Sequence, residues 1–530
     1  SRQGGNTSSG AGGQTGASSS RESKSGRASL KALFPKFIVP QGHGTLSIST
    51  FHAKSSKGVL SLVAPELGWV EKESLEQRAS IYWVVSPEDT EFRLQNHKEN
   101  QRISRIPGMH ELCKKVPFAR LMKEMSKRMP EQFNFHPKTE ILPGTDDASL
   151  AHLFRKGPAI LKPDEGTQGD GIYIVTGFEE AKRRMEMNKM EGAVLQEYIP
   201  RPLLLHGLKF DIRAYVLILS LEPLRIFMCR EGLVRVCSLP YEAPNRNNMH
   251  NTAKHLTNFS INKSNSGFVH NDDVRNGEKG SKRLLSAVLR HMQEHGKDVK
   301  GLLREVKTVI ANGAAALAEA LLDRTESIDP AKLWPCGSRR SEKLQGCTTA
   351  FGDFSWGQWQ QECFHLLGFD VMLDERGKAY LLEVNCNPSL AYDSIYSPDT
   401  PVPSEMLAID KEVRDLMEAG MEFCKGRGTR VCKCHACPHR SHVHRPCAID
   451  IVLKTACVGG ALAIVGRDIN EQKAGGSANP DELVKGTCYE VVRVRDSSEA
   501  EAEAKAQNVN QPETDSKTEG LPPRPKEQAR

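Results

Sequence analysis

Apolar and polar residues alternate along this chain with two different periods, which predict strands in some segments and helices in others. Apolar runs with the period of a strand occupy residues 81–85, 159–162, 171–175, 194–199, 209–219, 224–229 and 234–237. Helical patterns occupy residues 108–129, 282–322 and 356–367, the last with Ser355 as its N-cap and Gly368 at its end. This mixture predicts an α/β (α+β) fold.

Two apolar runs joined by a turn near residue 377 predict a hairpin whose two strands together carry three polar residues. If Arg376 and Gly377 form a two-residue loop, Asp370 lies opposite Glu383, and Asn385 shares the face of Glu383. Neighbouring carboxylates repel one another, so this set favours a hard cation such as Mg²⁺. An edge hairpin with solvated polar residues is the alternative, and a bulge in the turn would break the geometry.

A glycine-rich segment separates two predicted strands further upstream. Lys162 ends the first strand, and Gly166, Gln168, Gly169 and Gly171 follow before the second. Backbone amides in such a loop can fold over phosphates while the lysine pairs with them. The Gly-Lys-Ser/Thr ending of a Walker loop is absent, and a plain hairpin loop is the alternative.

A strictly alternating strand places Lys209, Asp211 and Arg213 on one face, which suits an anion, with a solvated outer face as the alternative. Arg235 follows on another strand. The end of an earlier apolar strand would offer backbone groups to a purine edge. That strand end consists of Gln196, Glu197, Tyr198 and Ile199. Together with the glycine segment and the hairpin, these residues predict a nucleotide site with Mg²⁺ between carboxylates and phosphates.

These motifs, in this order, resemble the tubulin tyrosine ligase-like family of ATP-grasp ligases. The resemblance covers roughly residues 100–424 and rests on segments 162–171, 196–198, 209–213, 229–232, 255–258 and 368–385. It implies an N-terminal α/β domain (30–143), a central ATP-grasp domain (144–206) and a C-terminal ATP-grasp domain with the metal site (207–425). Outside them we expect a disordered Gly/Ser-rich tail (1–29), a Cys/His-rich segment (426–450) and a poorly ordered C-terminal region (451–530).

The resemblance also implies roles for single residues. Catalysis would fall to Arg213, Arg235 and Glu383, and Mg²⁺ would be held by Asp370, Glu383 and Asn385. ATP and the acceptor side would be lined by Lys115, Lys162, Gly166, Gln168, Gly169, Gly171, Gln196, Glu197, Tyr198, Ile199, Lys209, Asp211, Thr257 and Asn258. Lys114 matches almost as well as Lys115, both could be exposed helix charges, and Thr257–Asn258 could be a simple turn.

The family joins an amino acid to a protein carboxylate, which ATP first converts to an acyl phosphate. The motifs look most like those of the tubulin polyglutamylases, so we expect free glutamate to be added to the acidic tails of tubulin. Asp170 stands where relatives often carry Arg or Lys, which suggests the alternative of a catalytically silent tubulin-binding relative. A tyrosine or glycine ligase of the same family, or a small-molecule carboxylate-amine ligase, are further alternatives.

Composition sets limits on partners and location. Lys and Arg number 72 against 66 Asp and Glu, a net charge of +6 that favours acidic partners weakly and does not indicate nucleic-acid binding. Residues 1–29 lack a secretory signal, and Asp450 and Lys454 interrupt the apolar stretch 448–466, so no membrane span is expected. We expect a monomer in the cytoplasm and on the cytoskeleton, with the cilium or basal body as a more specific location.

A second metal site is one of two interpretations of the Cys/His-rich segment. Four cysteines in this segment are interleaved with His435, His439, His442 and His444 and could bind Zn²⁺: Cys432, Cys434, Cys437 and Cys447. The spacing is not that of a standard zinc finger, and a reduced, basic Cys/His-rich loop is the alternative.

Overall fold

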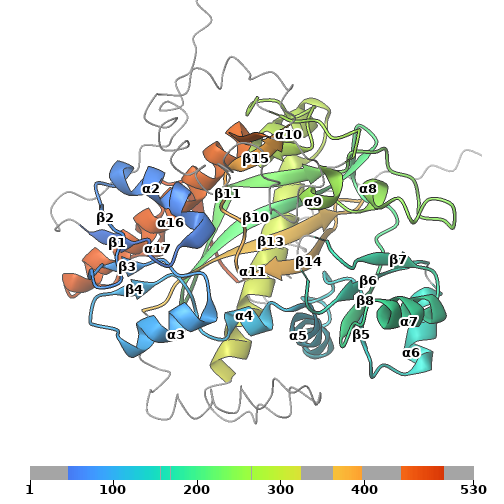
Figure 1. The fold of residues 1–530 in the computed structure, drawn as a ribbon, viewed down its shortest axis with the longest axis horizontal. Helices are drawn as coiled ribbons and strands as arrows, with labels where there is room; N and C mark the ends of the chain where they lie inside the picture. Colours follow the sequence, from blue (N-terminus) through green and yellow to red (C-terminus); the bar gives the residue numbers. More distant parts are fainter. Residues whose placement is uncertain are drawn as a thin grey trace, which may run out of the picture.

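The computed structural model describes residues 46–155, 157–166, 169–263, 265–271, 273–323, 362–396 and 443–494 (Figure 1). Within these ranges the strands form two four-stranded sheets, one seven-stranded sheet and one two-stranded sheet. The α/β character predicted from the sequence is confirmed. Figure 1 shows the N-terminal elements, drawn in blue, on one side of the largest sheet and the small sheet within residues 139–197 on the other.

The N-terminal sheet is parallel and has the order β2-β1-β3-β4. Its elements are β1 (Ser47–Ser49), a 3-10 turn (Lys54–Ser56), α2 (Lys57–Glu66), β2 (Val70–Lys72), β3 (Ile81–Tyr82), α3 (Pro87–Gln95) and β4 (Arg102–Ile103). Two helices follow, the short α4 (Met109–Leu112) and the longer α5 (Lys115–Arg128). The helix predicted over 108–129 is therefore broken in two, because Lys114 between them is extended.

The central sheet is antiparallel and has the order β5-β8-β6-β7. Its elements are β5 (Thr139–Leu142), α6 (Asp147–Phe154), β6 (Ala159–Pro163), β7 (Tyr173–Val175), α7 (Phe178–Met187) and β8 (Ala193–Glu197). The predicted boundary at residue 143 leaves β5 in the N-terminal domain, and this is wrong. β5 pairs with β8 along its whole length, so it belongs to the central sheet.

The seven-stranded sheet has the order β12-β11-β10-β13-β14, and two further strands pair with inner ones, β17 with β11 and β9 with β10. Its strands are β9 (Leu204–Leu205), β10 (Leu208–Leu221), β11 (Leu224–Val236), β12 (Lys282–Leu284), β13 (His365–Leu373), β14 (Ala379–Asn385) and β17 (Tyr489–Val492). The remaining elements are α8 (Thr252–His255), α9 (Phe259–Asn262), α10 (Leu285–Glu294), α11 (Val299–Asp323), β15 (Asp393–Tyr396), β16 (Val443–Pro446), α16 (Ala448–Lys473) and α17 (Pro480–Leu483).

Two hydrophobic clusters cover the two faces of this sheet. Phe210 and Ile212 of β10 pack with α10 and α11 on one face. Tyr215 and Leu217 of the same strand pack with α2 and α16 on the other. Because side chains alternate along a strand, the odd-numbered residues at the start of β10 share the α16 face.

The helix predicted over 356–367 is wrong where the structure describes it. Residues 365–367 open strand β13, which pairs with β10 and is buried at every position. A strand buried on both faces has a continuous apolar run, which periodicity cannot distinguish from a buried helix. The pattern predicted over 282–322 divides into β12, α10 and α11.

The expectation of a poorly ordered region over residues 451–530 is wrong for residues 451–494, because most of α16 and all of α17 and β17 lie there. Residues 495–530 lie outside the described residues. Asp450 and Lys454, which interrupt the apolar stretch 448–466, are buried and ion-paired, with 2.9 Å between Oδ1 and Nζ. Their pairing lets an apolar helix continue through the core. By length and composition α16 is the one helix in the described part that could cross a membrane, but 94% of its apolar window is buried inside the fold.

Candidate functional site

The hairpin of β13 and β14 places Asp370 opposite Glu383, as predicted, but by a different route. Its loop has three residues, since Asp374 N–H donates to Lys378 O at 3.0 Å and Gly377 takes a φ of +86°. Three loop residues alone would pair Asp370 with residue 382. A register shift between Asp370 and Val371 adds one residue to β14 and restores the pairing with Glu383.

Four charged side chains form a neutral, buried arginine network across three adjacent strands: Asp211, Arg213, Arg235 and Asp370. Arg213 binds both oxygens of Asp370, with 2.8 Å from Nη2 to Oδ2. Arg235 binds both oxygens of Asp211, with 2.9 Å from Nε to Oδ1, and its Nη2 also lies 2.8 Å from Oδ2 of Asp370. Burial raises the pKa of Asp370, but the two guanidinium groups outweigh it and hold that pKa below its usual value.

The three predicted metal ligands lie together at the edge of this network. Asn385 Nδ2 donates to Asp370 Oδ2 at 3.3 Å and to Glu383 Oε1 at 3.4 Å, so its amide bridges the two carboxylates. Two carboxylates and an amide oxygen are hard donors of the kind that Mg²⁺ uses, so the donor set fits this ion. Binding a cation would require the amide to present its oxygen instead of its nitrogen.

Lys162 approaches the same site from the central sheet. Its Nζ donates to Gln196 Oε1 at 2.7 Å, and the residue is 8% exposed. Burial lowers the pKa of Lys162, whereas the nearby Glu383 carboxylate raises it and Lys115 lowers it further. The structure thus brings lysines from α5 and β6 to the carboxylates of β13 and β14.

The glycine loop (residues 163–171) contacts Lys115 at the start of α5. Lys115 Nζ donates to Gly166 O at 3.0 Å, whereas Lys114 pairs with Glu111, so the geometry favours Lys115 over Lys114. The described glycines of this loop all take positive φ, which residues with a Cβ rarely adopt. These glycines are Gly166, Gly169 and Gly171. Gln168 lies outside the described residues.

Thr257 and Asn258 lie next to the glycine loop. A Cβ on Gly169 would lie 3.1 Å from Cγ of Asn258, so the loop and the start of α9 pack closely. Thr257 is buried. Asp170, which follows Gly169, is exposed on the loop.

The backbone N–H groups of the segment from Gln196 to Ile199 are mostly hydrogen-bonded to other parts of the protein. Glu197 N–H donates to Lys138 O at 2.8 Å and Tyr198 N–H to Pro158 O at 3.3 Å, so within the described residues Ile199 is left to offer a backbone N–H to a base. The side chain of Tyr198 is buried and accepts from Lys209 Nζ at 3.0 Å. Burial lowers the pKa of Lys209 to about 8.

Two anchoring residues were missed by the sequence analysis. Asp164 Oδ1 accepts from Val116 N–H at 2.8 Å and so ties the start of α5 to the glycine loop. His136 lies 2.9 Å from Leu381 O and 3.4 Å from Gln196 Nε2, between the two sheets. Asp164 stands inside the glycine motif, which could have suggested a role, whereas no local pattern marks His136.

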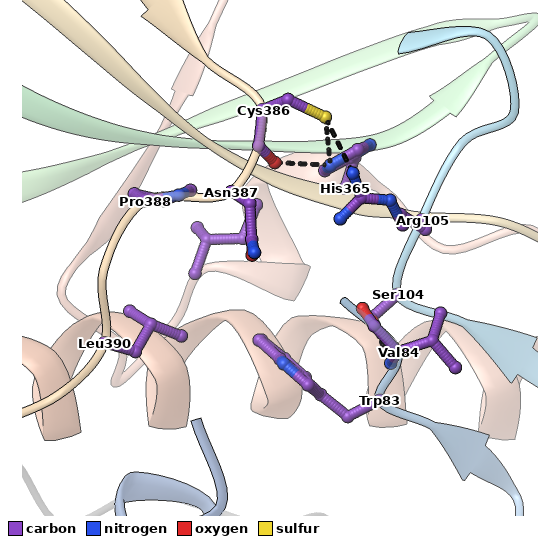
Figure 2. A pocket seen from close by; sticks show the side chains of 10 residues that line it. Trp83, Val84, Ser104, Arg105, His365, Cys386, Asn387, Pro388 and Leu390 are labelled. Carbon is purple, nitrogen blue, oxygen red and sulfur yellow. Dashed lines mark hydrogen bonds between the residues drawn. The ribbon is translucent and has the colours of Figure 1, made fainter. Parts of the chain in front are cut away.

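A separate cavity lies behind the end of β14 (Figure 2). His365 Nδ1 accepts from Ile106 N–H at 3.1 Å, so its Nε2 carries the proton and donates to Cys386 O at 2.8 Å. Figure 2 shows Arg105 and His365 beside the thiol of Cys386. None of the lining residues is a predicted site residue, but these bonds fix the residue that follows Asn385.

The predicted zinc site finds no support. Cys432, Cys434 and Cys437 lie outside the described residues. Cys447 is buried in the hydrophobic cluster around α16, and burial raises the pKa of its thiol to about 12. Within the described ranges no group of three or more His, Cys, Asp or Glu side chains is arranged to hold a metal ion.

Comparison of the sequence with known proteins identifies a family that it matches. The model of the tubulin-tyrosine ligase family matches residues 92–330 and 351–401. The chain is 33% identical over 363 residues to tubulin polyglutamylase ttll-11 of Caenorhabditis elegans (66% of this chain, 46% of that protein). It is 35% identical over 344 residues to tubulin polyglutamylase TTLL13 of Mus musculus (64% and 37%) and 32% identical over 380 residues to tubulin polyglutamylase TTLL11 of Mus musculus (70% and 48%). The chain thus spans less than half the length of these relatives.

Proposed function

Because this chain belongs to the tubulin-tyrosine ligase family, we propose that it is an ATP-dependent ligase that adds glutamate to carboxylates of acidic tubulin tails. The observation that carries the proposal is the meeting of Lys115, Lys162, the arginine network and the Asp370–Glu383 pair at one place. The choice of glutamate and tubulin is supported by the relatives named tubulin polyglutamylase.

The chemistry asks mainly for positioning and charge compensation. ATP would phosphorylate a carboxylate of the acceptor, and the amine of free glutamate would attack the resulting acyl phosphate. Mg²⁺ held by Asp370, Glu383 and Asn385 would neutralise charge on the phosphate oxygens. Lys162 and Lys115 would hold the phosphates under the glycine loop, and Ile199 would offer its N–H to the base.

Arg213 and Arg235 are suited to stabilise the developing charge. Both guanidinium groups are held rigidly by carboxylates, so they need little reorganisation when charge builds up on the transferred phosphoryl group. No nucleophilic side chain is needed, because the acceptor carboxylate and the amine are the nucleophiles. With tubulin as the substrate, the activity would lie in the cytoplasm at the microtubule cytoskeleton, and the cilium and basal body would be specific sites of this kind.

Incorporation of radiolabelled amino acids into purified tubulin tests the proposal. The protein should incorporate glutamate, and incorporation should require both ATP and Mg²⁺. Labelled tyrosine and labelled glycine, assayed side by side, should give none. Incorporation of tyrosine or glycine in place of glutamate would identify a different ligase, and no incorporation of any of the three would support a silent tubulin-binding protein.

A further inference from the structure

A buried chain of hydrogen bonds connects the end of β8, the start of β10 and α8. Lys209 Nζ donates to Tyr198 Oη at 3.0 Å, and Tyr198 Oη lies 3.1 Å from His255 Nδ1. The chain ends at Asn248 O, which lies 3.2 Å from His255 Nε2. Lys209, Tyr198 and His255 are each at most 2% exposed. They belong to three of the motifs on which the family resemblance rests, so this hydrogen-bond chain joins those motifs in space.

The donors and acceptors of the hydrogen-bond chain follow from its far end. The backbone oxygen of Asn248 can only accept, so Nε2 of His255 carries the ring proton and Nδ1 is left as an acceptor. Burial lowers the pKa of His255, which keeps its ring neutral at pH 7. The hydroxyl of Tyr198 therefore donates to Nδ1 while its oxygen accepts from Lys209.

Tyr198 supplies the directed contact of the Lys209 ammonium group. Among the described residues, Tyr198 Oη is the hydrogen-bond acceptor of Lys209 Nζ. Two aromatic rings also face this group, with 4.1 Å from Nζ to the ring centroid of Tyr198 and 5.8 Å to that of Tyr241. A ring face attracts a cation but accepts no conventional hydrogen bond from it. The hydroxyl of Tyr198 is therefore the contact that fixes the place of Nζ.

Lys209 lies beside the proposed nucleotide site. It shares one face of β10 with Asp211 and Arg213, and Arg213 belongs to the arginine network. Burial is the main cause that lowers the pKa of Lys209 to about 8; Cys237 and Asp211 act in the opposite direction, and the nearby charge of Lys162 lowers this pKa further. Lys209 is therefore mostly charged at pH 7 and loses its charge a little above it.

Tyr198 has no free N–H or hydroxyl group left for a purine base. Its backbone N–H donates to Pro158 O at 3.3 Å, and its hydroxyl donates to His255. We propose that Tyr198 and His255 are positioning residues that hold the ammonium group of Lys209 in place for ATP. This role replaces the contact with the base that the order of the motifs suggested for Tyr198. The proposal rests on the proposed function, which identifies the ligand as ATP.

The first test compares Tyr198→Phe with the wild type and with Tyr173→Phe. Tyr198→Phe removes the hydroxyl and keeps the ring that faces Lys209. Tyr173 lies on β7, and its hydroxyl donates to Asn188 Oδ1 at 3.1 Å, so Tyr173→Phe loses a hydrogen bond outside the chain. Loss of the acceptor of a charged donor should raise the KM for ATP by about tenfold in Tyr198→Phe and leave the KM for glutamate within about twofold. Tyr173→Phe should change neither KM.

The second test replaces His255. His255→Asn keeps an acceptor oxygen near the position of Nδ1, so it should retain most of the affinity for ATP. His255→Leu removes the acceptor of the Tyr198 hydroxyl and should bind ATP several-fold more weakly. If Tyr198→Phe does not fold, the comparison of these two variants takes its place.

The pH profile distinguishes positioning from a general loss of packing. In the wild type the affinity for ATP should fall above about pH 8, where Lys209 loses its proton, and Lys209→Arg should remove this fall because a guanidinium group stays charged. Without its acceptor the ammonium form is less favoured, so the fall should begin about one pH unit lower in Tyr198→Phe. A merely structural role would lower the melting temperature and leave both the onset of the fall and the ratio of the KM values unchanged.

Calorimetric titration with ATP and Mg²⁺ separates this proposal from the function it rests on. If the wild type incorporates no glutamate, yet Tyr198→Phe and His255→Leu bind ATP more weakly than the wild type, the proposed function fails and the positioning role stands. If the wild type incorporates glutamate and every folded variant of Tyr198 and His255 binds ATP as the wild type does, the positioning role fails alone. A wild type that binds no ATP overturns both.

Discussion

Replacing Asp370 with Asn should destabilise the folded protein far more than replacing Glu383 with Gln, although both carboxylates belong to the proposed metal site. The side chain of Asp370 is 2% exposed and accepts hydrogen bonds from the guanidinium groups of Arg213 and Arg235. Glu383 is less deeply buried, and its carboxylate accepts from the amide of Asn385 at 3.4 Å.

The expected losses follow from these contacts. Removing one partner of a buried ion pair costs about 3–5 kcal/mol, because the remaining charge is left without compensation. In the Asp370→Asn variant Arg235 keeps Asp211, so the uncompensated charge is that of Arg213, and we expect a loss of about 3 kcal/mol. Glu383→Gln keeps its shape and weakens one long hydrogen bond, so its cost should stay below about 1 kcal/mol.

Urea denaturation of the two variants and the wild type measures the difference in the free energy of unfolding. Ligase assays on the same samples measure the loss of activity. Asp370→Asn should lose both stability and activity, whereas Glu383→Gln should lose activity and keep its denaturation midpoint. Equal midpoints for the two variants, or a larger loss in Glu383→Gln, would refute the reasoning from burial and pairing.

Three further predictions concern protonation, the glycine loop and its charge. Burial lowers the pKa of His136 from 6.5 to about 4. Between these pH values the unfolded chain binds a proton that the folded protein does not, so the free energy of unfolding falls as the pH falls, by up to about 3 kcal/mol. Denaturation curves at about pH 7 and about pH 4.5 should show that His136→Gln loses this part of the pH dependence while the exposed His250→Gln keeps it; the same slope in both variants would contradict the assignment. Gly169→Ala should weaken ATP binding in a titration without unfolding the protein, because φ is +89° and a Cβ would lie 2.7 Å from a side-chain carbon of α9, whereas Gly177→Ala, with nothing within 4 Å of its Cβ, should bind ATP normally. Asp170→Lys should lower the KM for ATP several-fold at low salt and less at high salt, because it replaces a negative charge on the loop by a positive one; an unchanged KM would place Asp170 away from the phosphates.

Local patterns predicted the parts of the site that lie on single strands. The alternation around Asp211 places this residue and Arg213 on one face, and the structure confirms that the residues alternating with them, Phe210 and Ile212, point into the core. The pairing of Asp370 with Glu383 was also correct, although the loop length and the bulge that together produce it were not visible in the sequence.

Long-range contacts account for what the sequence did not reveal. The ion pairs of Asp450 join α16 to β12 and allow charged residues inside a core helix. No local sequence pattern predicts a partner as distant in sequence as Lys282. The apolar run at the start of β13 predicts a helix as readily as a strand, because a strand buried on both faces shows no alternation. The hydroxyl group of Tyr198 accepts a hydrogen bond from Lys209. This contact joins two sheets, and the spacing of the two residues in the sequence could not predict it.

Mass spectrometry of tubulin tails after incubation with the protein, ATP and free glutamate tests the central claim most directly. The wild type should produce a series of tail masses separated by one glutamate residue, and Glu383→Gln should leave the tails unchanged. Unmodified tails with the wild type, masses that correspond to tyrosine or glycine, or equal modification by Glu383→Gln would contradict the account.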